Sequence, residues 1–473
     1  MKLVLAALAL NLFVAAKAAP AWPQFRGPNA SGVAEDSKPP EKFGPTESVL
    51  WEIDLPYSPS SPCIWEDHIF VSTFDQNKLQ VRDYRRSDGE NRWARGFTAP
   101  VLEEYNKDEG SPAASTPATD GRVVVTYFGS FGLVCQTLNG AVVWTQSMPA
   151  ARTAGAFGSG TSPIIYSNKV ILNRDIQGNS AIMAFDLVSG KKLWETARPG
   201  AFTSYSTPVI LNQGSRTDIL VAGSINLKGY DLASGAERWV VRGLPASTCT
   251  TPVVTPEMVF FAGWSPGKAD SPWPTWQSVA DEHDKNKDGK ITTDELKEDE
   301  RATFLSFDQD QDGVITSKDW EQLGAFIAKG DNALLAIKPG GAGDVTEKNI
   351  AWKATRGLPY VASPLYYDGN VYTIKDGGML SCFDAKTGAV RYEQERIDAI
   401  GNYYASPVAA GGRVFLASLN GRVTVVRAGG SKPEILHHAD FNERIAATMA
   451  IVENKIYLRT KTKLYAFGTK SEK

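Results

Sequence analysis

Hydrophobic and polar positions alternate in short runs along most of the chain, and residues 161–195 show this pattern most clearly. Three runs rich in β-branched or aromatic residues predict strands: Ile164–Tyr166, Val170–Asn173 and Ala181–Phe185. A turn at Asp186–Gly190 follows, because Asp can accept backbone hydrogen bonds and Gly tolerates positive φ, and Trp194 lies in the run beyond it. The pattern predicts a meander of four antiparallel strands over roughly 40 residues, the length of one propeller blade.

Copies of this unit can be counted from the Ser-Pro or Thr-Pro dipeptide that opens each one. Seven prolines mark these openings: Pro62, Pro117, Pro163, Pro208, Pro252, Pro364 and Pro407. Successive prolines are 43–55 residues apart, except that 112 residues separate Pro252 from Pro364. An eighth unit begins at Thr448-Met449, where the proline is missing.

The eighth unit has room for only three strands, which we expect at Met449–Val452, Ile456–Arg459 and Lys463–Phe467. The alternating run Val49–Leu55, which contains Trp51, supplies the missing outer strand. Such an arrangement closes the ring and leaves no unpaired end to cap. The sequence therefore predicts an all-β fold, an eight-bladed β-propeller of four-stranded antiparallel blades.

Each unit also places large and small residues at fixed positions. In five units an aromatic residue lies four positions after the turn glycine, where we expect it to pack between neighbouring blades: Trp93, Trp144, Trp194, Trp239 and Tyr392. Cys135 and Cys382 occupy a third-strand position that is Ala or Gly in other units, which is typical of a small core residue. A bridge between Cys63 and Cys249 would have to cross the ring, so we expect four unbridged cysteines.

The chain begins with the pattern of a signal peptide at residues 1–18, an apolar run over Leu3–Ala16 that ends in the small-x-small sequence Ala16–Ala18. A buried N-terminal helix is the alternative interpretation. Because the first cysteine is Cys63, no lipid-modified cysteine can follow the signal, and the mature protein is expected to be periplasmic or secreted. Residues 19–48 are expected to form an extended segment laid over a surface.

The long interval between the fifth and sixth units contains an insertion at residues 265–330, which divides the propeller into residues 49–264 and 331–473. Two loops in it match the twelve-residue EF-hand pattern, in which oxygen ligands surround Ca²⁺. The expected ligands of the first loop are Asp284, Asn286, Asp288, Lys290 through its carbonyl, Thr292 through water, and a bidentate Glu295. Those of the second loop are Asp308, Asp310, Asp312, Val314, Thr316 and Asp319. We therefore expect a small α-helical EF-hand pair inserted in blade 5.

The two loops differ at their last ligand. Asp319 ends the second loop where Glu295 ends the first, and its shorter side chain predicts weaker Ca²⁺ binding. Ile291 and Ile315 are expected to pair between the loops. Residues 281–319 contain 13 acidic and 6 basic side chains, so Ca²⁺ is expected to stabilise the insertion. Structural and sensing roles for the ion are both open, and a structural role is expected.

In a propeller, the loops from the fourth strand of one blade to the first strand of the next meet at one mouth of the channel. Aromatic residues recur in six of these eight loops, where they would either stack on a planar ligand or pack the loops together. The candidate ligand-binding residues are Tyr57, Tyr105, Arg152, Tyr205, Tyr360, Tyr403 and Arg444.

The repeats AFDLVSGKKLW, GYDLASGAERW and CFDAKTGAVRY resemble the PQQ-type repeats of the quinoprotein alcohol-dehydrogenase-like propellers. The opening WPQFRGPN resembles the start of exported PQQ-type repeat proteins of planctomycetes and related bacteria. For the enzymes of this group, the resemblance implies pyrroloquinoline quinone (PQQ) beside vicinal cysteines, a Trp floor and a Ca²⁺ ion in the channel. The sequence has no Cys-Cys pair, so no catalytic residue is carried over, and PQQ stays an open alternative.

Net charge and hydropathy limit the classes of function that the sequence allows. A net charge of −3 gives no reason to expect nucleic-acid binding, and no later apolar run reaches the ~18 residues of a transmembrane segment. We expect a monomer that acts as a non-catalytic scaffold for an envelope protein or an extracellular ligand. The alternatives are a PQQ-dependent dehydrogenase with the quinone in the funnel, and an EF-hand pair that is itself a calcium-dependent protein-interaction module.

Overall fold

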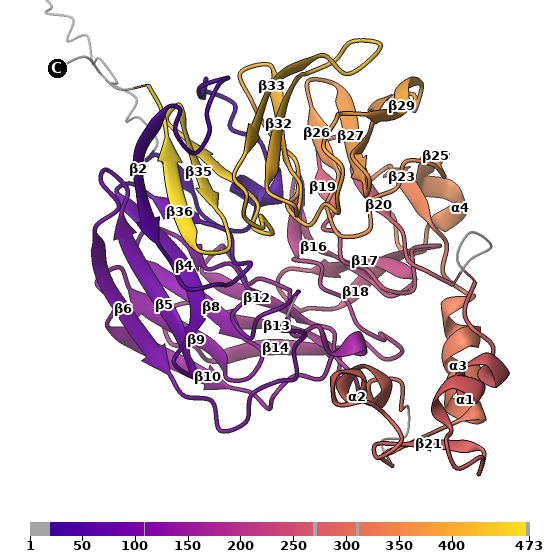
Figure 1. Cartoon of the computed structure of the whole chain (residues 1–473). Coiled ribbons are helices and arrows are strands. Elements are labelled where there is room, and N and C mark those ends of the chain that lie inside the picture. The colour runs from indigo at the N-terminus through magenta and orange to yellow at the C-terminus, as the bar shows by residue number, and fades with distance from the viewer. Residues whose placement is uncertain (1–18, 108, 268–271, 309–311, 470–473) are drawn as a thin grey trace, which may run out of the picture.

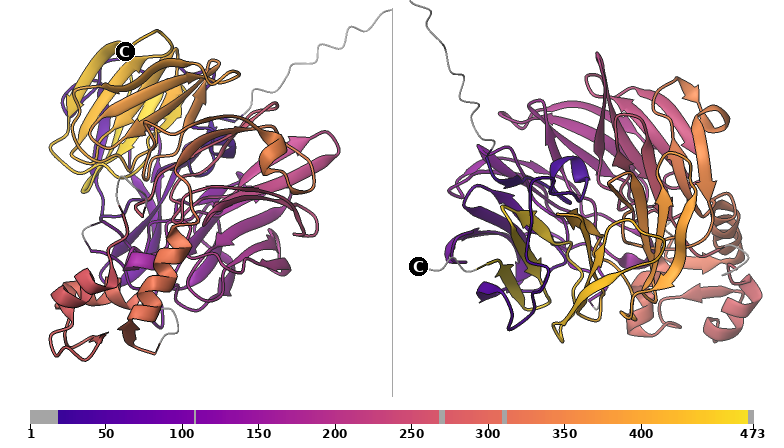
Figure 2. Two further views of the ribbon diagram at one scale, coloured as in Figure 1. Left: turned by 90° about the vertical axis from the view of Figure 1, so that its right-hand side faces the viewer. Right: turned by 90° about the horizontal axis from the view of Figure 1, so that it is seen from above.

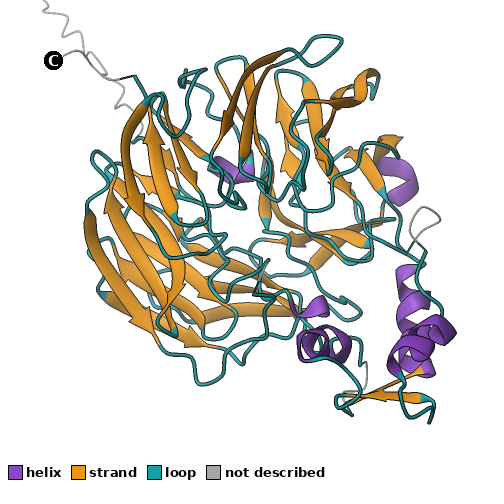
Figure 3. Cartoon of the chain, viewed as in Figure 1, coloured by secondary structure: helices purple, strands orange, loops and turns teal. Residues whose placement is uncertain are grey.

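The computed structural model describes residues 19–107, 109–267, 272–308 and 312–469, and the signal peptide predicted at 1–18 lies outside them. Eight of the nine sheets in the described structure are arranged around a central channel, which confirms the eight-bladed propeller (Figure 1). Within each blade, four antiparallel strands follow one another from the channel outward, in chain order except in blade 8, where the outermost strand is the N-terminal β2 (Val49–Asp54). Most of the helical residues belong to one insertion, which projects from the edge of the ring (Figures 2 and 3).

The first four blades use consecutive strands, with one extra strand in blade 1 and one in blade 4. Blade 1 contains β1 (Ala21–Trp22), β3 (Cys63–Trp65), β4 (His68–Asp75), β5 (Lys78–Arg85) and β6 (Asn91–Phe97). Blade 2 contains β7 (Ala118–Thr119), β8 (Val123–Phe128), β9 (Gly132–Thr137) and β10 (Val142–Ser147). Blade 3 contains β11 (Ile164–Tyr166), β12 (Lys169–Arg174), β13 (Ala181–Asp186) and β14 (Lys192–Ala197). Blade 4 contains β15 (Val209–Gln213), β16 (Arg216–Gly223), β17 (Asn226–Asp231), β18 (Glu237–Arg242) and, parallel to β18, β24 (Gly343–Asp344).

The last four blades complete the ring. Blade 5 contains β19 (Val253–Val254), β20 (Val259–Gly263), β23 (Ala333–Ile337) and β25 (Ile350–Ala354), the last preceded by the short helix α4 (Thr346–Asn349). Blade 6 contains β26 (Leu365–Tyr367), β27 (Asn370–Lys375), β28 (Met379–Asp384) and β29 (Val390–Arg396). Blade 7 contains β30 (Val408–Ala410), β31 (Arg413–Ala417), β32 (Arg422–Arg427) and β33 (Ile435–Asp440). Blade 8 contains β34 (Ala450–Val452), β35 (Lys455–Arg459), β36 (Lys463–Phe467) and β2 (Val49–Asp54).

The ring is closed by the N-terminal strand, as the sequence predicts. Strand β2 pairs antiparallel with β36, and Trp51 lies opposite Ala466. The fully buried Arg459 adds a clamp at the same junction, because its guanidinium donates to the carbonyls of Ser60 and Ser72 in blade 1 and of Pro56 in the loop before it. The seam between the first and last blades is therefore held by strand pairing and by a buried side chain.

The hydroxyl residues that open the units form a continuous belt around the channel. In every blade the amide of this residue donates to the hydroxyl of the equivalent residue in the next blade, at 3.0–3.2 Å. The belt runs in order through Ser61, Thr116, Ser162, Thr207, Thr251, Ser363, Ser406 and Thr448, and then returns to Ser61. The belt explains why each unit opens with Ser or Thr, since the side chain must accept a buried amide.

Five tryptophans at the aromatic position hydrogen-bond to the next blade, whereas the indole of Trp239 donates to Asp218 of its own blade. The indole N–H of Trp194 donates to the carbonyl of Leu232 in blade 4, and a Cβ at the turn glycine Gly235 would collide with the Trp194 ring. The same donation to the next blade joins Trp51, Trp93, Trp144 and Trp352 to the carbonyls of Arg86, Leu138, Leu187 and Ala385. The buried apolar clusters lie between neighbouring sheets, so the core is a ring of interfaces rather than one centre.

The small third-strand position lies directly opposite this aromatic residue. Cys135 pairs with Trp144 and Cys382 with Tyr392, as Ala184 pairs with Trp194. Both cysteines are buried, and all four cysteines of the chain are free thiols. The space beside the aromatic ring therefore restricts this position to a small side chain, because a larger one would displace the ring.

The N-terminal segment does not lie over a surface, so that prediction is wrong for residues 21–34. Strand β1 pairs with β3 on its channel side, and the 3-10 turn η1 (Pro28–Ala30) lies among the strands of the ring (Figure 3). The segment contacts inner strands on several sides of the channel, through the pairs Trp22–Ile64, Asn29–Ile210, Arg26–Pro364 and Val33–Ala409. These contacts belong to blades 1, 4, 6 and 7, so the chain fills its own channel.

The insertion of blade 5 lies between β20 and β23. It contains α1 (Trp276–His283), α2 (Glu298–Leu305) and α3 (Ser317–Ile327), with β21 (Lys290–Thr292) and β22 (Val314–Thr316) between them. The two short strands pair antiparallel, with Ile291 opposite Ile315 as predicted. A separate small core gathers these two residues with Val279, Leu296 and Trp320. We call this helical unit the module.

Candidate functional site

The loops that join successive blades gather on one face of the ring, which we call the mouth face. Two of the predicted residues, Tyr57 and Tyr360, lie near a carboxylate that the sequence did not single out, Glu109 in the loop 98–117. Tyr205 lies near Tyr360. Tyr404 Oη donates to Glu109 at 3.0 Å, and the Arg444 guanidinium lies 5.9 Å from the centre of the Tyr404 ring. Burial, and then the proximity of Glu109, raise the pKa of Tyr404. The phenol therefore stays protonated and available as a donor.

The Glu109 contact shows that the loop 98–117 crosses the mouth. This loop joins blades 1 and 2, whereas Tyr404 belongs to the loop between blades 6 and 7, 295 residues later in the chain. The tyrosine cluster thus lies beneath the loop rather than in an open funnel. Two hollows of the described structure lie elsewhere, one at the outer turns of blades 6 and 7 and one beside the module.

The remaining candidate residues are dispersed. Tyr105 packs edge-on against Phe74, with ring centres 6.1 Å apart. Tyr403 is buried, and its hydroxyl donates to the Ala399 carbonyl, so it faces away from its neighbour Tyr404. The Arg152 carbonyl accepts from the amide of Gln177, which ties the loop between blades 2 and 3 to blade 3. The structure therefore brings together about half of the predicted funnel.

A buried carboxyl lies at the edge of the mouth face. Glu103 is 3% exposed and accepts from the amide and hydroxyl of Ser159, at 3.0 and 2.7 Å, through one oxygen only. Its other oxygen, Oε1, has no hydrogen-bond partner. Burial raises the pKa of Glu103 to about 8, against the hydrogen bonds from Ser159 and the charge of Arg174. The carboxyl is therefore protonated at neutral pH.

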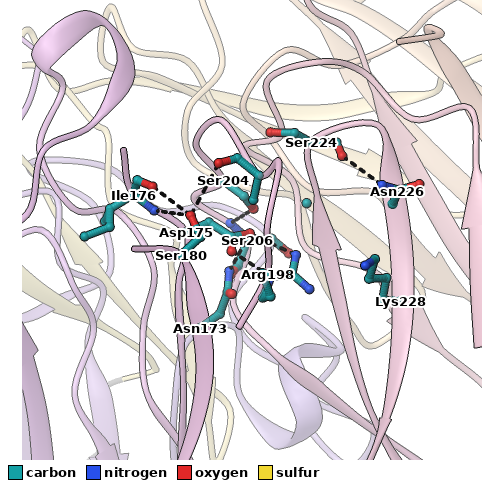
Figure 4. A network of polar contacts seen from close by, with 12 residues as sticks. Asn173, Asp175, Ile176, Ser180, Arg198, Ser204, Ser206, Ser224, Asn226 and Lys228 are labelled. Carbon is teal, nitrogen blue, oxygen red and sulfur yellow. Dashed lines mark hydrogen bonds and ion pairs between the residues drawn. The ribbon is translucent and has the colours of Figure 1, made fainter. Parts of the chain in front are cut away.

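A buried ion pair of blade 3, Asp175–Arg198, reaches blade 4 through Tyr230 (Figure 4). The guanidinium of Arg198 donates to both oxygens of Asp175, at 2.6 and 2.9 Å, and also to the hydroxyl of Tyr230. Although burial opposes it, the Asp175 charge raises the pKa of Arg198. Asn173 donates to Asp175 at 3.4 Å. With both carboxylate oxygens engaged by a cation, this network joins the blades and leaves no ligand position.

The first calcium-type loop has the chemistry that Ca²⁺ requires. Its donors are all oxygens, and Gly289 has φ +83°, which permits the sharp turn at the middle of the loop. The Glu295 carboxylate reaches back across the loop to the amides of Lys285, Asn286 and Thr292, at 3.0, 3.2 and 2.9 Å. These hydrogen bonds lower the pKa of Glu295 despite its burial. The carboxylate is thus held charged inside the loop.

The oxygens of this loop are engaged by its own amides, since Asp284 accepts from Gly289 and Asp288 from Lys290. Within the described ranges, no three His, Cys, Asp or Glu side chains already converge as a metal centre. In the second loop, Asp308 accepts from Gly313 at 2.8 Å, and Asp319 accepts from Thr316, whereas Asp310 lies outside the described residues.

The module docks on the mouth face. Ser306, at the end of α2, accepts from the amide of Gly155 at 2.7 Å in the 3-10 turn η2 (Ala154–Ala156) and also accepts, through its carbonyl, from Gln177. Phe326 of α3 packs against Phe202, with ring centres 5.9 Å apart. Between module and ring lies a hollow of about 230 Å³, whose lining includes Phe202, Asp308 and Phe326. The second calcium-type loop therefore begins at the ring surface.

Comparison with known proteins agrees with this geometry. The family profile described as outer membrane protein assembly factor BamB matches residues 77–251 and 301–473, and the EF hand profile matches residues 281–298. No curated protein matches the chain. The described residues include no helix of the length and apolar character that a membrane span needs.

Solved structures share the fold at low identity. BamB from Moraxella catarrhalis is 15% identical, with 90% of this chain and 98% of that chain covered at a TM-score of 0.55. A quinohemoprotein alcohol dehydrogenase from Comamonas testosteroni is 12% identical. The match covers 96% of this chain and 81% of that chain, at a TM-score of 0.56. A europium-containing methanol dehydrogenase is 11% identical. The match covers 95% of this chain and 98% of that chain, at a TM-score of 0.55. Since the profile matches more than half of its residues, the chain belongs to the family described as outer membrane protein assembly factor BamB.

Proposed function

We propose that the protein is an exported, non-catalytic scaffold that binds a protein of the cell envelope, or another extracellular ligand, through its mouth face. The observation that carries this proposal is a group of exposed apolar side chains on the loops of that face. Val101 is 65% exposed, Leu102 38%, Phe157 38% and Ile400 73%. Large apolar side chains on three loops of one face, beside a polar channel rim, are typical of a protein-docking surface.

The filled channel supports docking on the mouth face rather than ligand binding inside the ring. Residues 21–34 occupy the channel, and the loop 98–117 crosses its mouth to reach Tyr404. The family description names an assembly factor, and a scaffold that binds proteins is consistent with that description.

We further propose that the module binds Ca²⁺ as a structural ion. The first loop offers Asp284, Asn286, Asp288 and Glu295 side chains and the Lys290 carbonyl, an all-oxygen set on a backbone turned by Gly289. In the second loop, Asp308, Asp312, Asp319 and the Val314 carbonyl are the described donors. Because the module is acidic and its core is small, a cation offsets the carboxylate repulsion that opposes its folding.

Photo-crosslinking tests the docking surface. We would place a photoreactive phenylalanine at Ile400 on the mouth face and, as a matched control, at Val390, which is 56% exposed on the outer strand of the same blade. In cells that export the protein, Ile400 is expected to give a discrete crosslinked partner, and Val390 is not. The same products from both positions, or none from Ile400, would contradict the proposal.

The alternative is a PQQ-dependent dehydrogenase, and the aromatic mouth with Arg444 beside Tyr404 is the observation that favours it. The residues fit the quinone poorly, because the sequence has no Cys-Cys pair and the loop 98–117 already covers the tyrosines. Purification with added PQQ separates the two functions. A retained chromophore with dye-linked alcohol oxidation would favour the dehydrogenase, whereas loss of the quinone on gel filtration favours the scaffold.

A further inference from the structure

The outer edge of blade 4 is covered by a strand from the next blade. The segment 338–349, which connects β23 to β25 in blade 5, contains β24, and β24 lies parallel to β18 with Gly343 opposite Trp239. The amide of Val345 donates to the Val240 carbonyl at 3.0 Å, and the Val345 side chain is buried in the same apolar cluster as Trp239. An outer strand of this ring can therefore accept one further strand.

Blade 2 has the same edge without such a cover. Strand β10 is the last strand of its sheet in the described part of the chain, and the connection of blade 3 beside it spans only residues 187–191. Thr145 follows Trp144 in β10 as Val240 follows Trp239 in β18, and both tryptophans lie opposite the small third-strand residue. Because the Val240 carbonyl points outward to β24, the amide and carbonyl of Thr145 point outward at the uncovered edge.

Strand β10 also lacks the charges of the other outer strands. Among the fourth strands of the eight described blades, β10 is the only one without a Lys, Arg, Asp or Glu residue. Directly before the aromatic residue, blades 1, 4 and 6 have the ion-paired arginines Arg92, Arg238 and Arg391, whereas blade 2 has Val143. Charges on an edge strand oppose pairing with other chains, so β10 is the outer strand best suited to such pairing.

Exposed apolar side chains extend this edge onto blade 3. Val142 is 51% exposed and Val143 45%, and Val188 in the connection of blade 3 is 65% exposed. The Trp144 indole donates at 2.9 Å to the carbonyl of Leu187, directly before Val188, so the valines of the two blades flank one contact. Apolar side chains beside outward backbone groups are the features that recognise an extended peptide added to a sheet edge.

We propose that β10 accepts an extended segment of a partner protein as an additional strand, as β18 accepts β24. The outward amide and carbonyl of Thr145 pair with the segment, and Val143 and Val188 cover one of its apolar side chains, as the cluster around Trp239 covers Val345. The segment is uncharged where it meets these valines, because a charge there would be buried without a partner. This surface lies on the rim of the ring, so the proposal is independent of docking on the mouth face.

Fluorescence anisotropy of a labelled peptide tests strand addition to the whole protein. The probe alternates valine and threonine and has a lysine at each end for solubility. We expect saturable binding at micromolar to millimolar peptide, and a peptide with the same side chains but alternate backbone amides methylated should bind about tenfold more weakly or worse. Equal binding of the two peptides would assign the contact to side chains alone and overturn the proposal, as would no binding of either.

Two variants test whether the peptide binds at β10. Thr145→Pro removes the outward amide, a change that edge strands tolerate, and Val143→Arg introduces the charge that blades 1, 4 and 6 have at this position. Both should melt near the wild-type temperature and bind the peptide about tenfold more weakly. Glu195→Pro makes the matched change in β14, where Glu195 follows Trp194, and should bind like wild type. Unchanged binding by Val143→Arg overturns the proposal even if Thr145→Pro does not fold.

Sedimentation velocity without peptide tests the other occupant of this edge, a second copy of the chain paired through its own β10. We expect wild type and Val143→Arg to sediment alike, as monomers, when the protein concentration is raised. A wild-type dimer that Val143→Arg abolishes would show that β10 pairs with itself rather than with a partner segment, and would overturn the proposal.

Discussion

The ring and the module are stabilised in different ways, although one chain forms both. In the ring, the hydroxyl belt joins every blade to both of its neighbours, and tryptophan hydrogen bonds join five of the eight neighbouring pairs of blades. The module has one small core around Trp320 and meets the ring at a second apolar cluster, in which Leu323 and Ile327 pack with Ala246 of the ring. A hydrogen bond at Ser306 adds to this junction. Stability in the ring thus comes from closed repetition, whereas in the module it depends on one small core, on its apolar junction with the ring and, by our proposal, on a cation.

The largest expected effect is on the closing blade. Trp51→Ala removes a buried indole, its hydrogen bond to Arg86 and the packing on Gly89, so we expect a loss of about 3–5 kcal/mol in the free energy of unfolding. Urea unfolding followed by far-UV circular dichroism measures it. The whole ring should unfold at lower urea in one step, and a change confined to one blade would contradict the closed ring.

The equivalent change in the module should stay local. Trp320→Ala removes the largest side chain of the module core, whose indole donates to the Pro274 carbonyl. We expect rapid proteolysis within residues 272–330 while the ring unfolds at an unchanged urea midpoint. Limited proteolysis with mass spectrometry checks this result. A matching loss of ring stability would show that the two regions form one cooperative unit.

We expect Glu103 to make the stability of the ring depend on pH. Its pKa is about 8 in the folded protein and near 4.5 unfolded, so the folded state binds the extra proton. The contribution of the protonated Glu103 to the free energy of unfolding is complete below about pH 4.5. This contribution is lost as the pH rises through about 8, and it falls by up to ~1.4 kcal/mol per pH unit. Glu103→Gln keeps a neutral side chain and should be the more stable protein at pH 9, with little difference at pH 4. Parallel stability curves from pH 4 to 9 would refute this assignment.

Ca²⁺ should raise the stability of the module and leave the stability of the ring unchanged. With Ca²⁺ in excess over EGTA, we expect the module to gain about 1–3 kcal/mol, as mass action predicts for 10- to 100-fold saturation. Glu295→Gln should remove most of this gain, whereas the exposed Glu298→Gln is a control of equal charge change. Proteolysis of the module in Ca²⁺ and in EGTA measures the difference. Equal protection in both would contradict a structural calcium ion.

The smallest effect is expected in the belt. Ser363→Ala leaves the amide of Thr251 without its acceptor and should cost about 1–2 kcal/mol. Ser363→Thr keeps the hydroxyl, as other blades do, and should be close to neutral. Urea midpoints of both variants decide the matter, and an equal loss in both would assign the effect to packing rather than to the hydrogen bond.

The architecture of the ring could be predicted from the sequence because each repeat restates the same local rule. The positions of Ser363, Trp194 and Cys135 follow from spacing within a unit of roughly 40 residues, and copies in other units confirm the meaning of each position. The closing strand Val49–Asp54 was recognisable because the last unit lacked its fourth strand. The ligand pattern of the first calcium-type loop is equally local, since twelve consecutive residues supply it.

Only the tertiary structure decided what occupies the channel and its mouth. Arg26 meets Pro364 across 338 residues, and Glu109 meets Tyr404 across 295, so no local pattern records either contact. Tyr403 and Tyr404 are adjacent in sequence but face opposite ways, a choice made by the surrounding loops. Periodicity determines which residues belong to a blade, because it acts along the chain. Contacts between segments that do not repeat depend on where the closed ring places those segments in space.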